Sequence, residues 1–133
     1  MFRGLDVNGD GVSNATDDAI AKNLKFDRVP KYTAYVSAAY NIKAGDATVT
    51  PRVSYSYRSG YFTDALNNSY GYQGSYGLLD AAVRVEKGPW YANIYARNLT
   101  NELVFDFAAT IGGPFVRYGG VPRTYGLAIG YRY

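Results

Sequence analysis

The sequence predicts an all-β protein: an antiparallel meander of about five strands that forms part of the wall of a transmembrane β-barrel, after a short N-terminal loop and helix. Three observations predict it. Five segments alternate apolar and polar residues, short and long connections alternate between them, and aromatic residues gather at both ends of the segments. We assign residues 1–25 to the loop and helix, which would lie in an extracellular loop, and residues 26–133 to the strands.

The five segments carry their large apolar side chains on one phase of a period-two repeat, which is the pattern of a strand. They are KYTAYVSAAYNI, ATVTPRVSYSYR, GLLDAAVRVE, WYANIYAR and RTYGLAIGYRY, and their charged residues occupy the opposite phase, except Arg123. A soluble antiparallel sandwich would show the same alternation, so the strands alone leave that alternative open. In a barrel wall, the candidate lipid-facing residues are Val53, Tyr55, Val83, Ile94, Leu127 and Ile129, and the candidate lumen-facing residues are Arg52, Arg58, Asp80, Arg84, Arg97 and Arg132.

The connections favour the barrel. KAGD and KGP are tight turns rich in glycine and proline, whereas the other two connections are long. Outer-membrane barrels alternate short periplasmic turns with long extracellular loops. Aromatic residues that would form the two interfacial girdles lie near both ends of the segments: Tyr40, Trp90, Tyr131 and Tyr133 at the short turns, and Tyr32, Tyr57 and Tyr125 at the long loops.

Residues in the long loops are further candidates for contact with a ligand. The loop aromatics are Tyr61, Phe62, Tyr70, Tyr72, Phe105, Phe107, Phe115 and Tyr118. The alternative is that they pack against one another. The arginines of the polar phase could line a path for an anionic ligand, or could pair with carboxylates such as Asp80 and Glu86.

The stretch DVNGDGVSNATDD has the oxygen-donor spacing of a calcium-binding loop. A structural Ca²⁺ is therefore a candidate cofactor, and ATDDAIAKNLK after the loop is a plausible short helix. The alternative is a surface loop whose Asn, Asp and Gly residues serve only to form turns. The candidate ligands, at positions one, three, five, seven, nine and twelve of the loop, are Asp6, Asn8, Asp10, Val12, Asn14 and Asp17.

Composition excludes several classes of function. The chain has no cysteine and no histidine, which removes thiol nucleophiles, disulfides and histidine bases, and we expect no enzymatic activity. A formal net charge of +3 gives no argument for nucleic acid as a partner. No apolar run reaches the roughly 20 residues of a transmembrane helix, and the N-terminus lacks the pattern of a signal peptide.

Four stretches, VPKYTAYVSAAYNI, VSYSYRSGYF, YGLLDAAVRVEKGPWYANIYARNLTNE and PRTYGLAIGYRY, resemble the C-terminal end of TonB-dependent outer-membrane receptors. RNLTNE and the terminal stretch carry the resemblance most specifically. It implies energised uptake of a scarce ligand, of the siderophore, cobalamin or carbohydrate class, across the bacterial outer membrane. It also implies that the terminal aromatics Tyr131 and Tyr133 form a signal for the barrel-assembly machinery.

The resemblance implies partners as well: outer-membrane lipid, the remaining strands and plug of a full receptor, and an inner-membrane energy-coupling complex that acts through the plug. Because such receptors have about 22 strands, we expect the chain to be a fragment. An open sheet in hydrocarbon would leave unpaired backbone groups that cost several kcal/mol each. Two other hypotheses remain: a soluble calcium-binding β-domain of an adhesin or surface scaffold, and a small barrel closed by oligomerisation.

Overall fold

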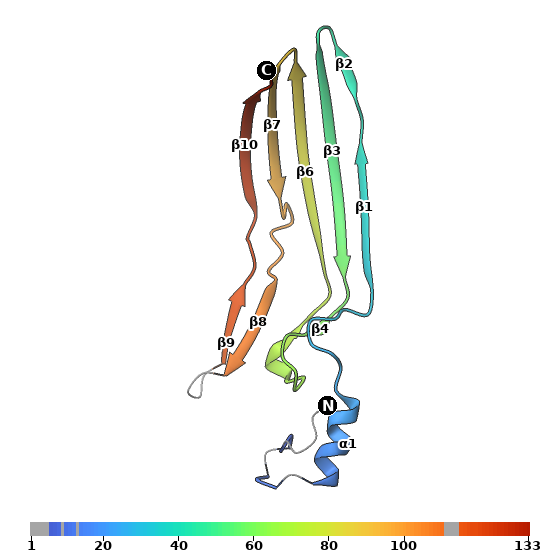
Figure 1. The fold of residues 1–133 in the computed structure, drawn as a ribbon, viewed down its shortest axis with the longest axis vertical. Helices are drawn as coiled ribbons and strands as arrows, with labels where there is room; N and C mark the ends of the chain where they lie inside the picture. The colour runs from blue at the N-terminus through green and yellow to red at the C-terminus, as the bar shows by residue number, and fades with distance from the viewer. Residues whose placement is uncertain (1–5, 9, 13, 111–114) are drawn as a thin grey trace.

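The computed structural model describes residues 6–8, 10–12, 14–110 and 115–133. Its centre is one open antiparallel sheet of long strands lying side by side (Figure 1). The strands follow the order β1-β3-β6-β7-β10, with β2 continuing β1 beside β3. Their bounds are Thr33–Ala39 for β1, Ile42–Ala44 for β2, Ala47–Arg58 for β3, Tyr76–Lys87 for β6, Trp90–Arg97 for β7 and Thr124–Tyr131 for β10. The all-β fold and the meander predicted from the sequence are confirmed.

The tight turns lie at one end of the sheet, together with the C-terminus, and we call this the short-turn end (Figure 1). Gly45 and Gly88 adopt φ values of 61° and 54° in these turns. L-residues with a Cβ rarely adopt that left-handed conformation, which explains why the turns contain glycine. The opposite end, called the long-connection end, carries residues 59–75 and 98–123 and the N-terminal helix (Figure 1).

The long connections contain structure that the alternation did not predict. Residues 59–75 form the short pair β4 (Tyr61–Phe62) and β5 (Tyr72–Gln73), with a 3₁₀ turn η1 (Ser69–Gly71) between them. The second connection forms the hairpin β8 (Phe105–Thr110) and β9 (Phe115–Gly119). Several loop aromatics do pack against one another, since the Phe62 and Tyr72 ring centroids are 5.1 Å apart and those of Phe107 and Tyr118 are 6.0 Å apart.

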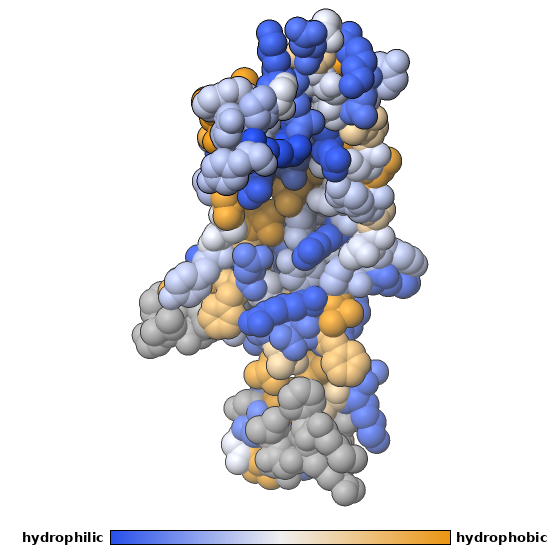
Figure 2. Space-filling view, turned by 45° about the horizontal axis from the view of Figure 1, so that its top comes forward, coloured by the Kyte–Doolittle hydropathy of each residue, from blue (hydrophilic) through white to orange (hydrophobic). Residues whose placement is uncertain are grey.

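The strand register places the apolar phases of all the long strands on one face. Directly paired residues point to the same side of a sheet, and Pro51, Val83, Ile94 and Leu127 are paired in one row across four strands. A neighbouring row, Thr50–Arg84–Asn93–Ala128, lies on the other face. We call these the apolar face and the polar face. In the view of Figure 2, hydrophilic residues gather toward the short-turn end, and apolar residues show at both edges and in the middle of the view.

Small residues on the polar face of β10 make room for aromatic rings of β7. A Cβ atom added at Gly126 would overlap the Tyr95 ring, and one at Gly130 would overlap the Tyr91 ring. Both glycines are directly paired with the tyrosine concerned. The alternation of small and large residues in the last strand therefore has a steric cause, because the rings of β7 lie across the glycines of its neighbour.

The N-terminal helix α1 (Ala15–Asn23) begins with a capping box. The side chain of Asn14 accepts a hydrogen bond from the Thr16 amide at 2.7 Å, and Asp17 accepts one from the Asn14 amide at 2.8 Å. This arrangement satisfies amide groups that the first helical turn leaves unpaired. None of the described helices has the length and apolar character needed to cross a lipid bilayer.

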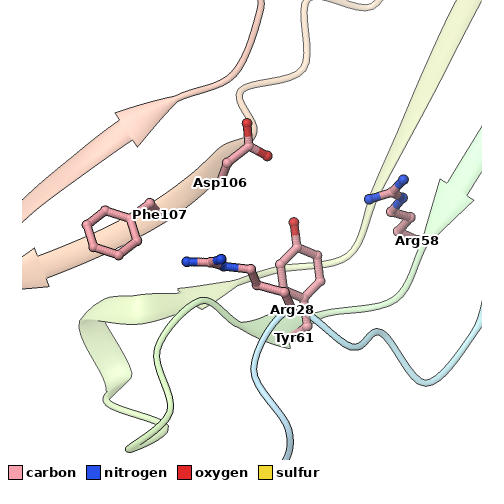
Figure 3. Close-up of a pocket in the computed structure, with 5 residues that line it drawn as sticks. All are labelled: Arg28, Arg58, Tyr61, Asp106 and Phe107. Atoms are coloured by element: carbon pink, nitrogen blue, oxygen red, sulfur yellow. The ribbon is translucent and has the colours of Figure 1, made fainter.

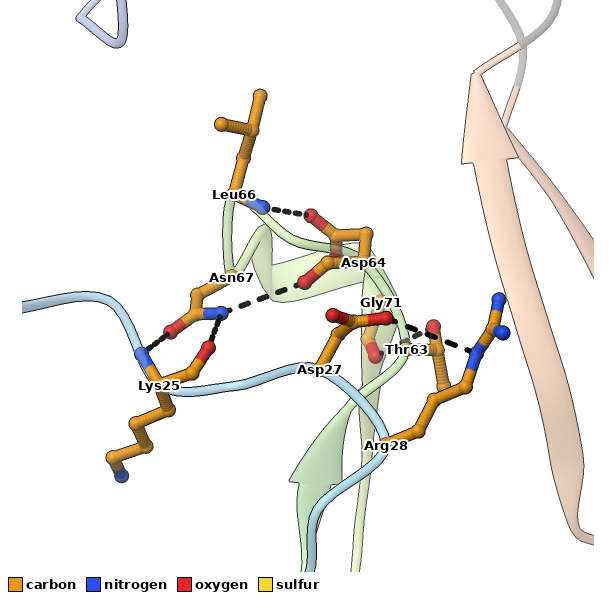
Figure 4. A network of polar contacts seen from close by, with 8 residues as sticks. All are labelled: Lys25, Asp27, Arg28, Thr63, Asp64, Leu66, Asn67 and Gly71. Atoms are coloured by element: carbon orange, nitrogen blue, oxygen red, sulfur yellow. Dashed lines mark hydrogen bonds and ion pairs between the residues drawn. The ribbon is translucent and has the colours of Figure 1, made fainter. Parts of the chain in front are cut away.

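The segment between α1 and β1 is fastened to the first long connection (Figure 4). The side chain of Asn67 accepts a hydrogen bond from the Lys25 amide at 2.6 Å and donates one to the Lys25 carbonyl at 2.9 Å. The Arg28 amide donates to the Phe62 carbonyl at 2.7 Å. These contacts fix the N-terminal segment, and with it the Arg28 side chain, beside β4.

We expect Asn67→Ala to release this segment, because both hydrogen bonds to Lys25 are lost at a net cost of about 2 kcal/mol. Limited trypsin digestion, followed by mass spectrometry, should show faster cleavage after Lys25 than in the unchanged protein. Asn41→Ala is the control, since Asn41 accepts its hydrogen bond from Thr50 at the short-turn end. Equal cleavage rates in both variants would contradict the fastening role.

Candidate functional site

A pocket of about 410 Å³ opens at the long-connection end, between segments that are far apart in the sequence. Arg28 comes from the segment before β1, Arg58 is the last residue of β3, and Tyr61 belongs to β4. Asp106 and Phe107 come from β8. Figure 3 shows the Arg28 guanidinium directed toward Asp106 and Phe107, and the Tyr61 hydroxyl directed into the space between Arg58 and Asp106.

The two arginines of the pocket have spare hydrogen-bonding capacity. The Arg28 guanidinium lies 5.8 Å from the Phe107 ring centroid, and its Nε is 4.0 Å from the carboxylate of Asp27, at the outer limit of an ion pair. Within the described residues, the side chain of Arg58 makes no hydrogen bond or ion pair. With a single carboxylate, that of Asp106, the pocket has an excess of positive charge.

Tyr61 is 6% exposed, and its burial raises the pKa of the phenol to about 12. The neighbouring Tyr76 hydroxyl raises this pKa further. The phenol therefore keeps its proton at neutral pH. The Tyr61 hydroxyl shares a hydrogen bond with Tyr76, and it can donate to an anion in the pocket when Tyr76 in turn donates to it.

The candidate lumen-facing residues share the polar face, but the structure does not gather them into one site. Arg52 and Asp80 lie in the middle of the sheet, Arg58 and Arg97 toward the long-connection end, and Arg84 and Arg132 toward the short-turn end. There, both Arg84 and Arg132 contact one Glu86 oxygen at 3.0 Å. This pairing of arginine with a wall carboxylate is one of the alternatives that the sequence left open.

The candidate lipid-facing residues lie exposed on the apolar face. Their exposed fractions run from 41% at Val83 to 66% at Ile129. These fractions show that no described part of the chain buries them. The set on this face is Val53, Tyr55, Val83, Ile94, Leu127 and Ile129.

The candidate assembly-signal residues, Tyr131 and Tyr133, lie at the short-turn end of the apolar face (Figure 1). Tyr131 is paired with Trp90, and their ring centroids are 4.9 Å apart at 67°. Tyr133 follows, with its ring centroid 5.9 Å from that of Tyr131. The exposed rings of Trp90, Tyr131 and Tyr133 therefore form an aromatic cluster at the short-turn end of the apolar face.

In the candidate calcium loop, the side-chain oxygens hold the loop's own backbone. The Asp6 carboxylate accepts hydrogen bonds from the amides of Asp10 and Gly11 at 3.2 and 2.7 Å. Asn8 accepts from the Asp10 amide at 3.0 Å, and Asp10 accepts from the Val12 amide at 2.8 Å. Carboxylate and amide oxygens such as these are typical calcium ligands. They also form the turns of the alternative interpretation.

Asp17 fixes the loop to the helix. Its carboxylate is 1% exposed and accepts hydrogen bonds from the amides of Val7, Asn8 and Asn14 at 2.9, 3.1 and 2.8 Å. Among the residues that the structure describes, no three acidic, histidine or cysteine side chains come together as a metal-binding group. The donor chemistry thus fits calcium, while the carboxylate at position twelve is engaged with backbone amides.

These amides, that of Asn14 first, lower the pKa of Asp17 below its ordinary value. Because the folded carboxyl is the stronger acid, its stabilising contribution is complete above the pKa of the unfolded group, about 4. It is lost as the pH falls through the lower folded pKa. We expect acidification from about pH 5 to about pH 2 to open the loop first. NMR signals of the Val7 and Asn14 amides should shift before those of the β3–β6 ladder, and a simultaneous change would contradict this.

The RNLTNE stretch forms a network of hydrogen bonds between strands. Asn98 is 5% exposed with φ 50°; its side chain donates to the carbonyls of Glu102 and Val121 at 2.9 and 3.3 Å and accepts from the Glu102 amide at 2.8 Å. The Asn98 amide donates to Asp80 at 2.8 Å. Arg123 donates from its amide to Asn101 at 3.1 Å. This stretch therefore ties the start of the second long connection to β6 and to the residues before β10.

The fold defines the class of structure: an open antiparallel sheet of the kind that makes up a β-barrel wall, not itself closed into a barrel. Among solved structures, the ferric yersiniabactin uptake receptor FyuA from Yersinia pestis is similar, with a TM-score of 0.72 and 22% sequence identity. The similarity covers 77% of this chain and 16% of that receptor, so the chain spans only a small part of that receptor's length. No protein-family model and no curated protein matches the sequence significantly.

Proposed function

We propose that the chain forms part of the barrel wall of a TonB-dependent receptor in a bacterial outer membrane. In this role it takes part in energised uptake of a scarce ligand of the siderophore, cobalamin or carbohydrate class. The observation that carries the proposal is the division of one sheet into an exposed apolar face and a charged polar face. The fold similarity to a ferric yersiniabactin uptake receptor supports it.

Each feature of the sheet has a partner under this proposal. Outer-membrane lipid covers the apolar face, and a plug lies against the polar face. The remaining strands of the receptor pair with β1 and β10, which are the outer strands of the sheet in the described residues. The inner-membrane energy-coupling complex acts through the plug. The barrel-assembly machinery binds the terminal strand with Tyr131 and Tyr133.

Proteolysis of intact cells tests the proposal, because exposed basic residues occur at both ends of the sheet. Lys25 and Arg117 lie at the long-connection end, and Lys43 and Lys87 lie at the short-turn end. Trypsin added to intact cells should cleave after Lys25 or Arg117, and should reach Lys43 and Lys87 only after the outer membrane is opened. Since all four are exposed in the structure, protection of the second pair requires a membrane. Cleavage after Lys43 in intact cells, or recovery of the protein in the soluble fraction, would contradict it.

The second candidate is a soluble calcium-binding β-domain of an adhesin or surface scaffold, favoured by the oxygen donors of residues 6–17. Calcium binding itself is compatible with both proposals, as a structural ion in an extracellular loop. Calorimetry with calcium, using Asp10→Ala as the comparison, tests the ion. The adhesin proposal further requires a water-soluble monomer, which the large apolar face argues against.

A further inference from the structure

The pocket formed by Arg28, Arg58, Tyr61, Asp106 and Phe107 combines charged groups, a phenol and an aromatic ring on one concave surface. Arg58 belongs to the polar face of β3, so the pocket lies on the side of the sheet that would face a barrel lumen. Its position at the long-connection end is where a ligand arriving from outside would first meet the wall.

We propose that this pocket binds a ligand that carries a carboxylate on a hydroxylated aromatic ring. The inference rests on the proposed function, and it names the chemical class of ligand that the wall itself recognises. A carboxylate suits the guanidinium groups of Arg28 and Arg58, because planar guanidinium binds carboxylate through two parallel hydrogen bonds. The Tyr61 hydroxyl supplies a further donor.

The remaining two residues select the rest of the ligand. Phe107 is 39% exposed and offers a ring against which a planar group can pack. The Asp106 carboxylate accepts a hydrogen bond and repels a second negative charge, so it favours a hydroxyl group on the ligand. An inorganic dianion would satisfy the arginines but would offer no hydroxyl group to Asp106 and no planar group to Phe107.

The position of Arg28 in the pocket depends on the contacts that hold the N-terminal segment beside β4. Arg28 is held beside β4 by its own amide, which donates to the Phe62 carbonyl, and has a φ of 58°. Its guanidinium then extends over Phe107. Arg58 stands on a strand that is paired on both sides, so its backbone is equally fixed. The backbones of the two arginines are therefore held by different elements, and their guanidinium groups are left able to bind an anion.

Binding of 4-hydroxybenzoate to the purified full chain in detergent micelles tests the inference, with saturation-transfer NMR or calorimetry as the readout. We expect binding of 4-hydroxybenzoate, at least about tenfold weaker binding of the neutral 4-hydroxybenzamide, and no measurable binding of acetate. Arg58→Gln should weaken binding of 4-hydroxybenzoate by about tenfold or more, and Tyr61→Phe by about fivefold.

Arg52→Gln is the matched control, since Arg52 lies on the same strand and the same face outside the pocket. It should leave binding unchanged. Equal binding of the acid and the amide, or equal losses in Arg52→Gln and Arg58→Gln, would overturn the inference. Circular dichroism of the strands identifies any variant that fails to fold, and Arg28→Gln then replaces it. Because this assay needs no transport and no cell envelope, its outcome is independent of the trypsin test of the proposed function.

Discussion

Replacing Ile94 with arginine is expected to prevent the protein from accumulating in the outer membrane. Ile94 lies on the apolar face, paired with Val83 and Leu127, and is 63% exposed. On the lipid side of a barrel, arginine near the middle of the bilayer costs about 2–4 kcal/mol. We therefore expect the amount recovered in the outer-membrane fraction to fall by roughly tenfold or more, measured by immunoblotting of fractionated cells.

Asn93→Arg is the matched control for this prediction. Asn93 precedes Ile94 on the same strand but lies on the polar face, paired with Arg84 and Ala128. Under the proposed function an arginine there faces the lumen, so accumulation should be nearly unchanged. A soluble sheet predicts a different result, because a charge on an exposed face improves solubility. Equal recovery of both variants would therefore contradict the proposal that the apolar face contacts lipid.

Asn98→Ala is expected to lower the free energy of unfolding by about 4 kcal/mol. The substitution removes the three side-chain hydrogen bonds of Asn98, which is itself buried, and takes these partners from backbone groups of Glu102 and Val121. Each such loss costs about 1–1.5 kcal/mol, with a further cost for alanine in the left-handed conformation of this residue. Urea unfolding in detergent micelles, followed by circular dichroism, measures the effect.

Two further variants isolate the cause. Asn98→Asp keeps the shape and the tolerance of positive φ, but it loses both donors and brings a charge near Asp80. Its loss of stability should approach that of Asn98→Ala. Thr100→Ala removes a single 3.5 Å hydrogen bond to the Gly77 carbonyl from the same loop, and should cost less than about 1 kcal/mol. A similar small loss in all three variants would show that the side-chain carboxamide of Asn98 does not stabilise the RNLTNE stretch.

The strand pattern was predictable because it is local. Alternation at period two requires only that neighbouring side chains point to opposite sides, so Val83 and Arg84 were assigned to different faces without knowledge of their partners. The register then placed the separately phased segments on common faces. The tight turns were equally local, since glycines with positive φ stand at Gly45 and Gly88.

The contacts at the long-connection end were not predictable in this way. Asn67 bonds Lys25 across 42 positions of the chain, and Asn98 bonds Val121 across 23. Each asparagine stands in a stretch that has no period, and its positive φ is not visible in a sequence. The resemblance of RNLTNE marked the stretch that contains Asn98, but not the bonds that this side chain makes. At the N-terminus, Asn14 and Asp17 did carry a local signal, the spacing of a capping box, which the calcium-like spacing overlapped.

The amino-acid sequence by itself determined the strands, their two faces and the sorting of short and long connections, because these depend on the order of neighbouring side chains. Tertiary structure alone decided that Arg28, Arg58, Tyr61, Asp106 and Phe107 surround one pocket. The physical reason is that the meander and its hairpins bring together residues from four separate elements, and no local preference of the backbone encodes that meeting.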